Sequence, residues 1–153
     1  MTTRTSFPVR YSEIDKMGIV HHSNYPKWFE IGRRDYLYKA GIPNSCINSQ
    51  GFYLPLSELE CKFKSPARYG DEITVITGIT FISCVKVRFE YKVLNKKSGK
   101  TIAFGSTVHA WTGRDIKPLN IEKAAPHIYT SLKTRVEIGG INGDNGTMYV
   151  HRQ

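Results

Sequence analysis

The clearest hydrophobic pattern in this chain follows Tyr25, where apolar residues recur at spacings of three and four. This spacing gives one apolar stripe on a helix. Ser23 or Asn24 is placed to cap the helix start, and Pro26 suits its first turn. Gly41 and Pro43 then end it. The stripe consists of Tyr25, Trp28, Phe29, Gly32, Tyr36 and Ala40.

The rest of the pattern alternates, which is typical of strands. Strands are expected at residues 4–14, 52–63 (interrupted by Pro55), 72–81, 85–93 and 101–112, with turns at 65–71 and 95–99. In 85–93 the odd-numbered residues from Val85 to Val93 are apolar, which predicts one buried and one wet face. A weaker helix is expected at about 122–135, with Ile128, Leu132 and Val136 four residues apart.

One long helix followed by a meander of strands predicts an α+β fold in which the sheet curls around the helix. The 153 residues suit one domain, which we assign to residues 1–138. Residues 139–153 contain four glycines and little apolar pattern. We expect them to form a tail that is flexible unless a partner orders it.

The composition indicates which compartment and which class of ligand to expect. The sequence has no apolar run long enough for a membrane span, and its first residues lack the apolar core of a signal peptide. Three widely spaced cysteines argue against a zinc site or a disulfide framework, so we expect a cytoplasmic protein. The net charge of +9 favours a phosphate-bearing small molecule, because no nucleic-acid-binding motif accompanies the basic residues.

The segment before the helix carries the candidate chemistry. Asp15 lies in a loop with Gly18, and His21 and His22 follow just before the helix start. A carboxylate beside a helix N-terminus can act as base or nucleophile, while free N–H groups stabilise an oxyanion. Asp15 could equally be an ordinary turn carboxylate, and Glu13 is a competing carboxylate at the end of the first strand. A metal site at the two histidines is disfavoured, because adjacent side chains should diverge.

The segment Arg10-Tyr-x-Glu-x-Asp-x-x-Gly-Ile-Val-x-x-x-Asn-Tyr-x-x-Trp-Phe-Glu30 resembles the signature of the 4-hydroxybenzoyl-CoA thioesterase family of hotdog proteins. Pro66-Ala-Arg-Tyr-Gly-Asp71 is similar to that family's entry to its third strand. The resemblance covers roughly residues 5–135. It implies a curved antiparallel sheet wrapped on a central helix, edge-to-edge dimers with the active site at their interface, and hydrolysis of an acyl-CoA thioester without a cofactor.

By this resemblance Asp15 matches the catalytic carboxylate, as nucleophile or as the base that activates water. His22 matches the position whose backbone N–H polarises the thioester carbonyl, with its side chain as a second candidate. Tyr25 lines the pocket, and Glu30 matches an acidic helix residue with a structural role. The substrate-binding loop includes Gly18 and Val20. The candidate phosphate contacts are Arg68, Lys86, Arg88 and Lys92.

Two other functions stay open. One is hydrolysis of acyl groups carried by acyl carrier protein, whose acidic surface would suit a basic enzyme. The other is a non-catalytic acyl-CoA or nucleic-acid binding module. We expect a homodimer that assembles further into a homotetramer, with 71–81 as the edge strand that pairs.

Overall fold

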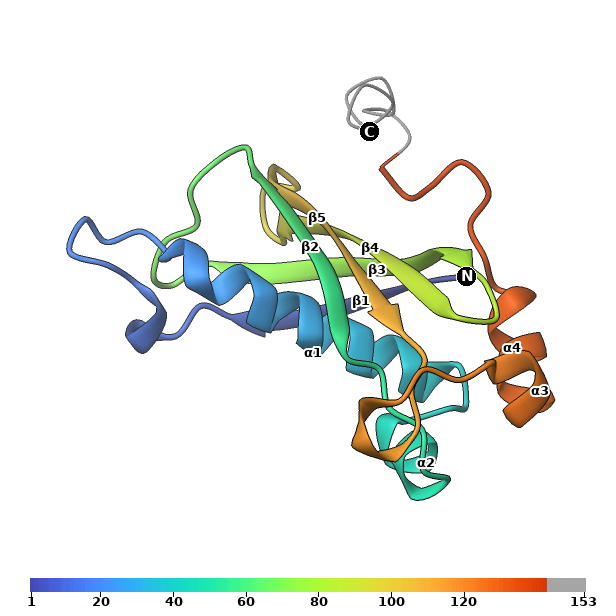
Figure 1. Cartoon of the computed structure of the whole chain (residues 1–153). Helices are drawn as coiled ribbons and strands as arrows, with labels where there is room; N and C mark the ends of the chain where they lie inside the picture. Colours follow the sequence, from blue (N-terminus) through green and yellow to red (C-terminus); the bar gives the residue numbers. More distant parts are fainter. Residues whose placement is uncertain (143–153) are drawn as a thin grey trace.

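The computed structural model describes residues 1–142, in which a five-stranded antiparallel sheet wraps around helix α1 (Figure 1). The strand order is β1-β3-β4-β5-β2. The strands are β1 (Thr2–Pro8), β2 (Leu56–Phe63), β3 (Glu72–Ile82), β4 (Lys86–Asn95) and β5 (Thr101–Ala110). The helices are α1 (Tyr25–Lys39), α2 (Asn44–Ser49), α3 (Ile121–Ala124) and α4 (Pro126–Lys133). This is the α+β hotdog arrangement that the sequence predicted.

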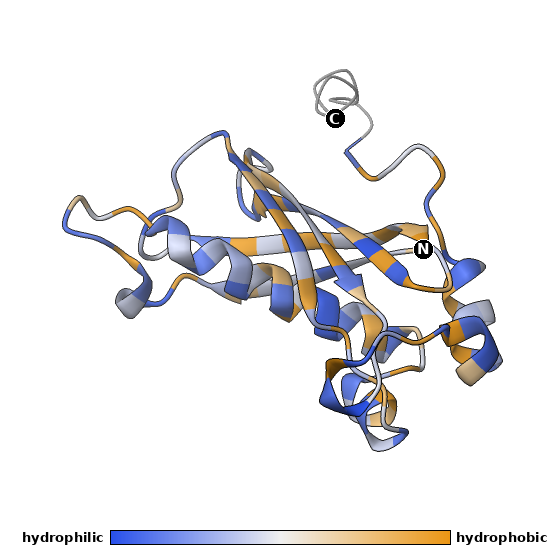
Figure 2. Cartoon of the chain, viewed as in Figure 1, coloured by the Kyte–Doolittle hydropathy of each residue, from blue (hydrophilic) through white to orange (hydrophobic). Residues whose placement is uncertain are grey.

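Helix α1 packs its apolar stripe on the concave face of the sheet. Every member of the predicted stripe is buried, and the Phe29 ring stacks on Tyr91 with 4.5 Å between centroids. Glycines permit the close approach: a Cβ on Gly32 would lie 2.5 Å from the Thr77 hydroxyl oxygen, and one on Gly105 would lie 2.2 Å from the Phe29 ring. Apolar and polar residues alternate along β4, and the strands in general carry both kinds of residue (Figure 2).

The first strand is shorter than predicted. β1 ends at Pro8, and Tyr11–Glu13 forms a 3-10 helix (η1) instead of extending the strand to residue 14. The Glu13 N–H donates to the Arg10 carbonyl at 2.9 Å, while the Arg10 N–H donates to Glu13 Oε1 at 2.7 Å. These reciprocal bonds satisfy the backbone locally, and they turn the Glu13 side chain inward.

The start of α1 also differs from the prediction that Ser23 or Asn24 caps the helix. Asn24 is at the N-cap, but its side chain accepts no capping hydrogen bond. The Asn24 amide instead donates to the carbonyls of Glu13 at 2.9 Å and His21 at 3.2 Å. Asn24 therefore fixes the preceding loop to the helix rather than satisfying the helix N–H groups.

Three strand predictions need correction. β3 lies between β1 and β4, so residues 71–81 are not an edge; the edges are β1 and β2. Val85 precedes β4 and is 52% exposed, whereas Glu90, predicted on the wet face, is buried. The predicted strand at 52–63 begins only at Leu56, after Pro55, and α2 occupies part of the segment before it.

The helical region at 122–135 consists of the two short helices α3 and α4. They part at Ala125, directly before Pro126, because a residue preceding proline is pushed out of the helical region. Ile128 and Leu132 are buried as their spacing predicted. None of the helices in the described part of the chain has the length and apolarity that a membrane crossing requires.

The segment after α4 crosses the outer face of the sheet. The Glu137 N–H donates to the Ile79 carbonyl at 2.8 Å, and the Asn142 amide donates to Glu90 Oε1 at 3.4 Å. This segment covers Glu90, which explains the burial of a carboxylate on that face. Of the tail predicted at 139–153, the part from position 143 onward lies outside the described residues.

Candidate active site

Asp15 is held in a tight loop whose backbone bonds to its own side chain. Asp15 Oδ1 accepts hydrogen bonds from the Met17 N–H at 2.7 Å and the Ile19 N–H at 3.4 Å. The Asp15 N–H donates to the Ile19 carbonyl at 2.8 Å, and Gly18 closes the turn with φ +80°. The carboxylate is thus oriented by the loop and half-buried. Its orientation does not depend on a salt bridge, because the side-chain contacts found for it are these backbone donors.

The two histidines follow in a 3-10 helix (η2, His22–Asn24) that leads directly into α1. The His21 ring accepts from the Ser23 N–H at 3.2 Å, and its Nδ1 lies 2.8 Å from the Ser23 hydroxyl. Within the described residues, the His22 N–H is not paired with a backbone carbonyl. It is therefore available to an external acceptor at the start of the helix.

Asp15 and His22 share a pocket of about 380 Å³. Its floor includes Tyr25, which is 2% exposed and packs edge-on against Phe63 with 4.9 Å between ring centroids. Burial, with a smaller contribution from Cys61, raises the pKa of Tyr25 to about 12, so its hydroxyl is neutral at physiological pH. The full lining is Asp15, Ile19, Val20, His21, His22, Tyr25, Phe63, Lys64, Ser65 and Pro66.

The structure brings four of the predicted site residues together: Asp15, Val20, His22 and Tyr25 all line this pocket. Gly18 does not line it and acts through the turn. Arg68 is exposed next to the loop, where it forms a β-bridge with Ile19.

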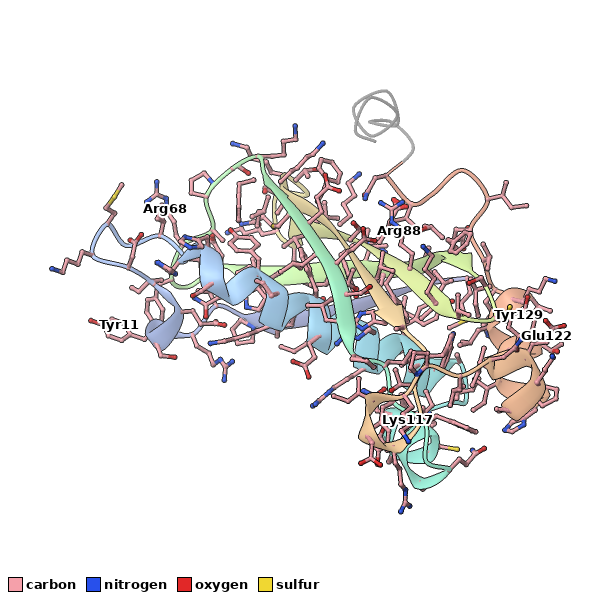
Figure 3. The ribbon with its side chains drawn as sticks, in the orientation of Figure 1. Tyr11, Arg68, Arg88, Lys117, Glu122 and Tyr129 are labelled. Carbon is pink, nitrogen blue, oxygen red and sulfur yellow. The ribbon has the colours of Figure 1, made fainter. Side chains whose placement is uncertain are left out.

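Lys86 and Arg88 lie elsewhere in the subunit. They lie in the first residues of β4. The opposite end of this strand, at Asn95, pairs with Ile73, and Ile73 lies next to the end of β1 that leads to the pocket. Figure 3 shows Arg88 far from Tyr11 and Arg68. Lys92 is closer to the pocket end, and its ammonium lies 5.7 Å from the Phe104 ring centroid. Within one subunit, Lys86 and Arg88 are therefore not brought to the Asp15 pocket.

Sequence reasoning missed the pocket wall formed by the last residue of β2 and the turn that follows it. Phe63, Lys64, Ser65 and Pro66 line the pocket although they are far from Asp15 in the sequence. Lys64 is the one lysine in this lining, which contains no arginine. Its ammonium lies 6.0 Å from the Phe104 ring centroid. The only local sequence signal was the turn at 65–71, since a strand pairing between distant segments is not visible in local periodicity.

Glu13, the competing carboxylate, does not reach the pocket. It is 4% exposed, and Glu13 Oε2 accepts from the Trp28 indole N–H at 2.9 Å. Glu30 pairs with Arg34 at 3.0 Å on the helix surface. Glu30 also lines a larger cavity of about 470 Å³, together with Arg33, Tyr53 and Thr112. No residue of the Asp15 loop lines this second cavity.

The histidine pair is closer than expected. The His21 and His22 rings lie 4.1 Å apart at 33°, so these adjacent side chains do not diverge. Within residues 1–142, no group of three histidine, cysteine, aspartate or glutamate side chains is arranged to hold a metal ion.

With a carboxylate, an unpaired N–H and a pocket in place, comparison with known proteins identifies the family. Residues 9–128 match the model of the thioesterase-like superfamily. The chain belongs to this superfamily. The resemblance seen in the motif is thereby confirmed, and the protein is a thioester hydrolase by family.

Three relatives show the range of this family. The chain is 30% identical to a putative acyl-CoA thioesterase, YneP, of Bacillus subtilis, over 86% of this chain and 95% of that protein. It is 28% identical to the chloroplastic acyl-acyl carrier protein thioesterase ATL3 of Arabidopsis thaliana, over 74% of this chain and 60% of that protein. The structure of a DHNA-CoA thioesterase from Staphylococcus aureus superposes with a TM-score of 0.83 at 28% identity, covering 87% and 89% of the two chains.

Proposed function

We propose that this protein is an acyl-CoA thioesterase that hydrolyses an acyl-CoA thioester to the free acid and coenzyme A. The observation that carries the proposal is the pocket shared by Asp15 and the unpaired His22 N–H at the start of α1. The names of two relatives, an acyl-CoA thioesterase and a DHNA-CoA thioesterase, support coenzyme A as the carrier.

The chemistry uses two groups. The thioester carbonyl lies over the helix start, where the His22 N–H donates to its oxygen and stabilises the oxyanion of the tetrahedral intermediate. Asp15 either attacks the carbonyl carbon itself or removes a proton from the attacking water. The C–S bond then breaks, and the thiolate leaves and takes up a proton to give coenzyme A. Attack by water gives the free acid directly, whereas attack by Asp15 leaves an acyl-aspartyl anhydride that a water molecule hydrolyses to the free acid and the Asp15 carboxylate. The neutral Tyr25 hydroxyl shapes the pocket wall beside the carbonyl.

Several further expectations belong to this proposal. The mechanism needs no cofactor, since both groups come from the polypeptide. The enzyme acts as a homodimer joined at a sheet edge, with a homotetramer as the larger assembly, and in that assembly Lys86 and Arg88 are candidate phosphate contacts. The cytoplasmic location stays a prediction.

Hydrolysis of acyl-acyl carrier protein is the second candidate. The similarity to ATL3 favours it, and the +9 chain suits an acidic carrier. The two candidates differ only in what carries the acyl group beyond the pantetheine arm.

The test is a panel of acyl-CoA thioesters with detection of the free thiol, repeated with the same acyl groups on acyl carrier protein. Asp15→Asn is the matched variant, because its amide oxygen can still accept the Met17 and Ile19 N–H bonds. We expect kcat to fall by at least about 10²-fold in this variant, with little change in KM. Full turnover by Asp15→Asn would disprove the assignment of the carboxylate. A much higher kcat/KM with the carrier protein would favour the second candidate.

A further inference from the structure

Two exposed tyrosines stand beside the pocket and have no part in the chemistry above. Tyr11 is 74% exposed and Tyr69 is 60% exposed, and their rings meet edge to face with centroids 5.6 Å apart. Exposed aromatic rings in contact are costly to leave in water, and they offer a planar apolar surface to a ligand. We call Tyr11 and Tyr69 the rim pair.

The rim pair is anchored on the two segments that form the pocket. Tyr11 begins η1, just before Asp15, and Tyr69 follows the pocket residues 63–66. These segments are joined by the Val20 N–H, which donates to the Ala67 carbonyl at 2.8 Å, and by the bridge between Ile19 and Arg68. Figure 3 shows Tyr11 and Arg68 at the same end of the molecule. The rim pair therefore stands on the same two segments that line the pocket, without lining the pocket itself.

The surroundings of the rim pair are basic. Arg10 and Arg68, which adjoin the two tyrosines in sequence, are both exposed. The nearby carboxylates are already engaged: Glu13 accepts from the Trp28 indole and the Arg10 backbone N–H, and Asp71 Oδ2 accepts from the Arg68 N–H at 2.8 Å. The Arg10 guanidinium lies 3.7 Å from Glu13 Oε2 while 67% of its side chain remains exposed to a ligand. Asp15 Oδ1 accepts from the Met17 and Ile19 N–H groups of its own loop. The site therefore favours an anion that also carries an aromatic ring.

We propose that the rim pair is the binding site for the adenine ring of the substrate's coenzyme A, with Arg68 and Arg10 binding the phosphates. The proposal rests on the function proposed above and adds where the nucleotide lies. Adenine can stack on an exposed tyrosine ring, because every base has a π-face. The guanidinium fork matches phosphate oxygens, and both arginines adjoin the tyrosines in sequence.

The test compares an acyl-CoA with the same acyl group on pantetheine, which lacks the nucleotide. In the double variant Tyr11→Ala/Tyr69→Ala we expect KM for the acyl-CoA to rise roughly tenfold or more, the scale of lost base stacking, with kcat retained. KM for the pantetheine thioester should not change.

Tyr38→Ala is the matched control for the double variant, since Tyr38 is 71% exposed near the far end of α1. Arg68→Gln should also raise KM for the acyl-CoA, whereas Arg4→Gln, which removes an equal charge from exposed β1, should not.

A binding measurement separates this proposal from the proposed activity. Calorimetry with adenosine 3′,5′-bisphosphate should show binding that the double variant loses and Tyr38→Ala keeps. If no thioester is hydrolysed but this binding pattern holds, the proposed activity fails and the nucleotide site stands. An equal rise in KM for both thioesters would overturn the site, because the rim pair would then only support the loop. The site is also overturned if the double variant impairs only hydrolysis of acyl-acyl carrier protein.

Discussion

Glu13 and Asp15 are two carboxylates of similar chemistry, separated by one residue, in opposite environments. The η1 turn directs Glu13 into the core against Trp28, whereas Asp15 faces a loop and a pocket. Periodicity assigned Glu13 to a strand end, while the loop position and the family resemblance together favoured Asp15, but nothing in the pattern predicted that Glu13 is buried. The reason is physical: a 3-10 turn held by side-chain bonds leaves no period in the sequence from which burial could be predicted.

This difference predicts opposite phenotypes for two isosteric substitutions. Glu13→Gln should lower the free energy of unfolding by about 1–3 kcal/mol, because the new NH2 group meets the Arg10 and Trp28 donors. The folded fraction should keep most of its kcat. Asp15→Asn should leave the urea midpoint nearly unchanged while turnover falls. Urea unfolding and single-turnover kinetics on both variants check this, and the reverse pattern would exchange the roles of the two residues.

His109 gives the protein a stability that depends on pH. It is 1% exposed, with Nδ1 3.0 Å from the Leu54 carbonyl and Nε2 2.9 Å from the Thr107 hydroxyl. Burial, aided by the charge of Arg33, lowers the pKa of His109 from 6.5 to about 4. The unfolded chain therefore binds a proton at higher pH than the folded one. Folding stability should fall as pH drops from about 6.5 to about 4, by on the order of 3 kcal/mol.

The measurement is the pH dependence of the free energy of unfolding over that window. In His109→Gln the dependence should become shallower than in the wild type, whatever its absolute stability. His127→Gln is the control, because His127 is exposed on α4 and should leave the slope unchanged. Identical slopes in the wild type and His109→Gln would mean that other groups cause the acid sensitivity.

At the scale of elements, α1 was predicted within one residue because its stripe repeats over several turns and is fully buried. Strand ends were predicted less well. The outer face of β4 was expected to be wet, but the segment 137–142 covers Glu90. Burial imposed by a segment fifty residues away leaves no trace in the alternation of β4 itself.

The contact between α1 and β5 predicts a strong effect at Gly105. A Cβ there would lie 2.2 and 2.4 Å from two Phe29 ring atoms, so the helix could not keep its distance from the sheet. Gly105→Ala should lower the free energy of unfolding by about 3 kcal/mol through overpacking. A Cβ on Gly113 would lie 3.5 Å from its nearest neighbour, Leu119 Cδ2, so Gly113→Ala should not overpack and should change the free energy of unfolding by less than about 1 kcal/mol. Thermal unfolding of both variants makes the comparison, and equal stabilities would contradict it.

For the whole molecule, the two sheet edges differ in what they expose. β1 exposes mainly polar residues such as Arg4 and Ser6. β2 exposes Leu56, Leu59 and Phe63, at 53%, 46% and 54%. Solvated edges are normally kept polar or charged, which makes β2 the edge suited to pairing with another chain. If the edge-to-edge dimer expected from the sequence forms, we expect it to pair through β2 rather than through residues 71–81.

A two-fold pairing of β2 with its copy predicts that the protein elutes at twice the monomer mass or more. Leu59 lies near the middle of β2, so in an antiparallel self-pairing the two copies of this residue come close to the axis. Leu59→Lys should then place like charges beside each other and shift the equilibrium toward monomer. Val85→Lys adds the same charge at an exposed valine outside the strands and should leave the mass unchanged. Light scattering at micromolar concentration measures all three proteins. A monomeric wild type would rule out the β2 dimer and leave the Asp15 pocket to act with one subunit alone.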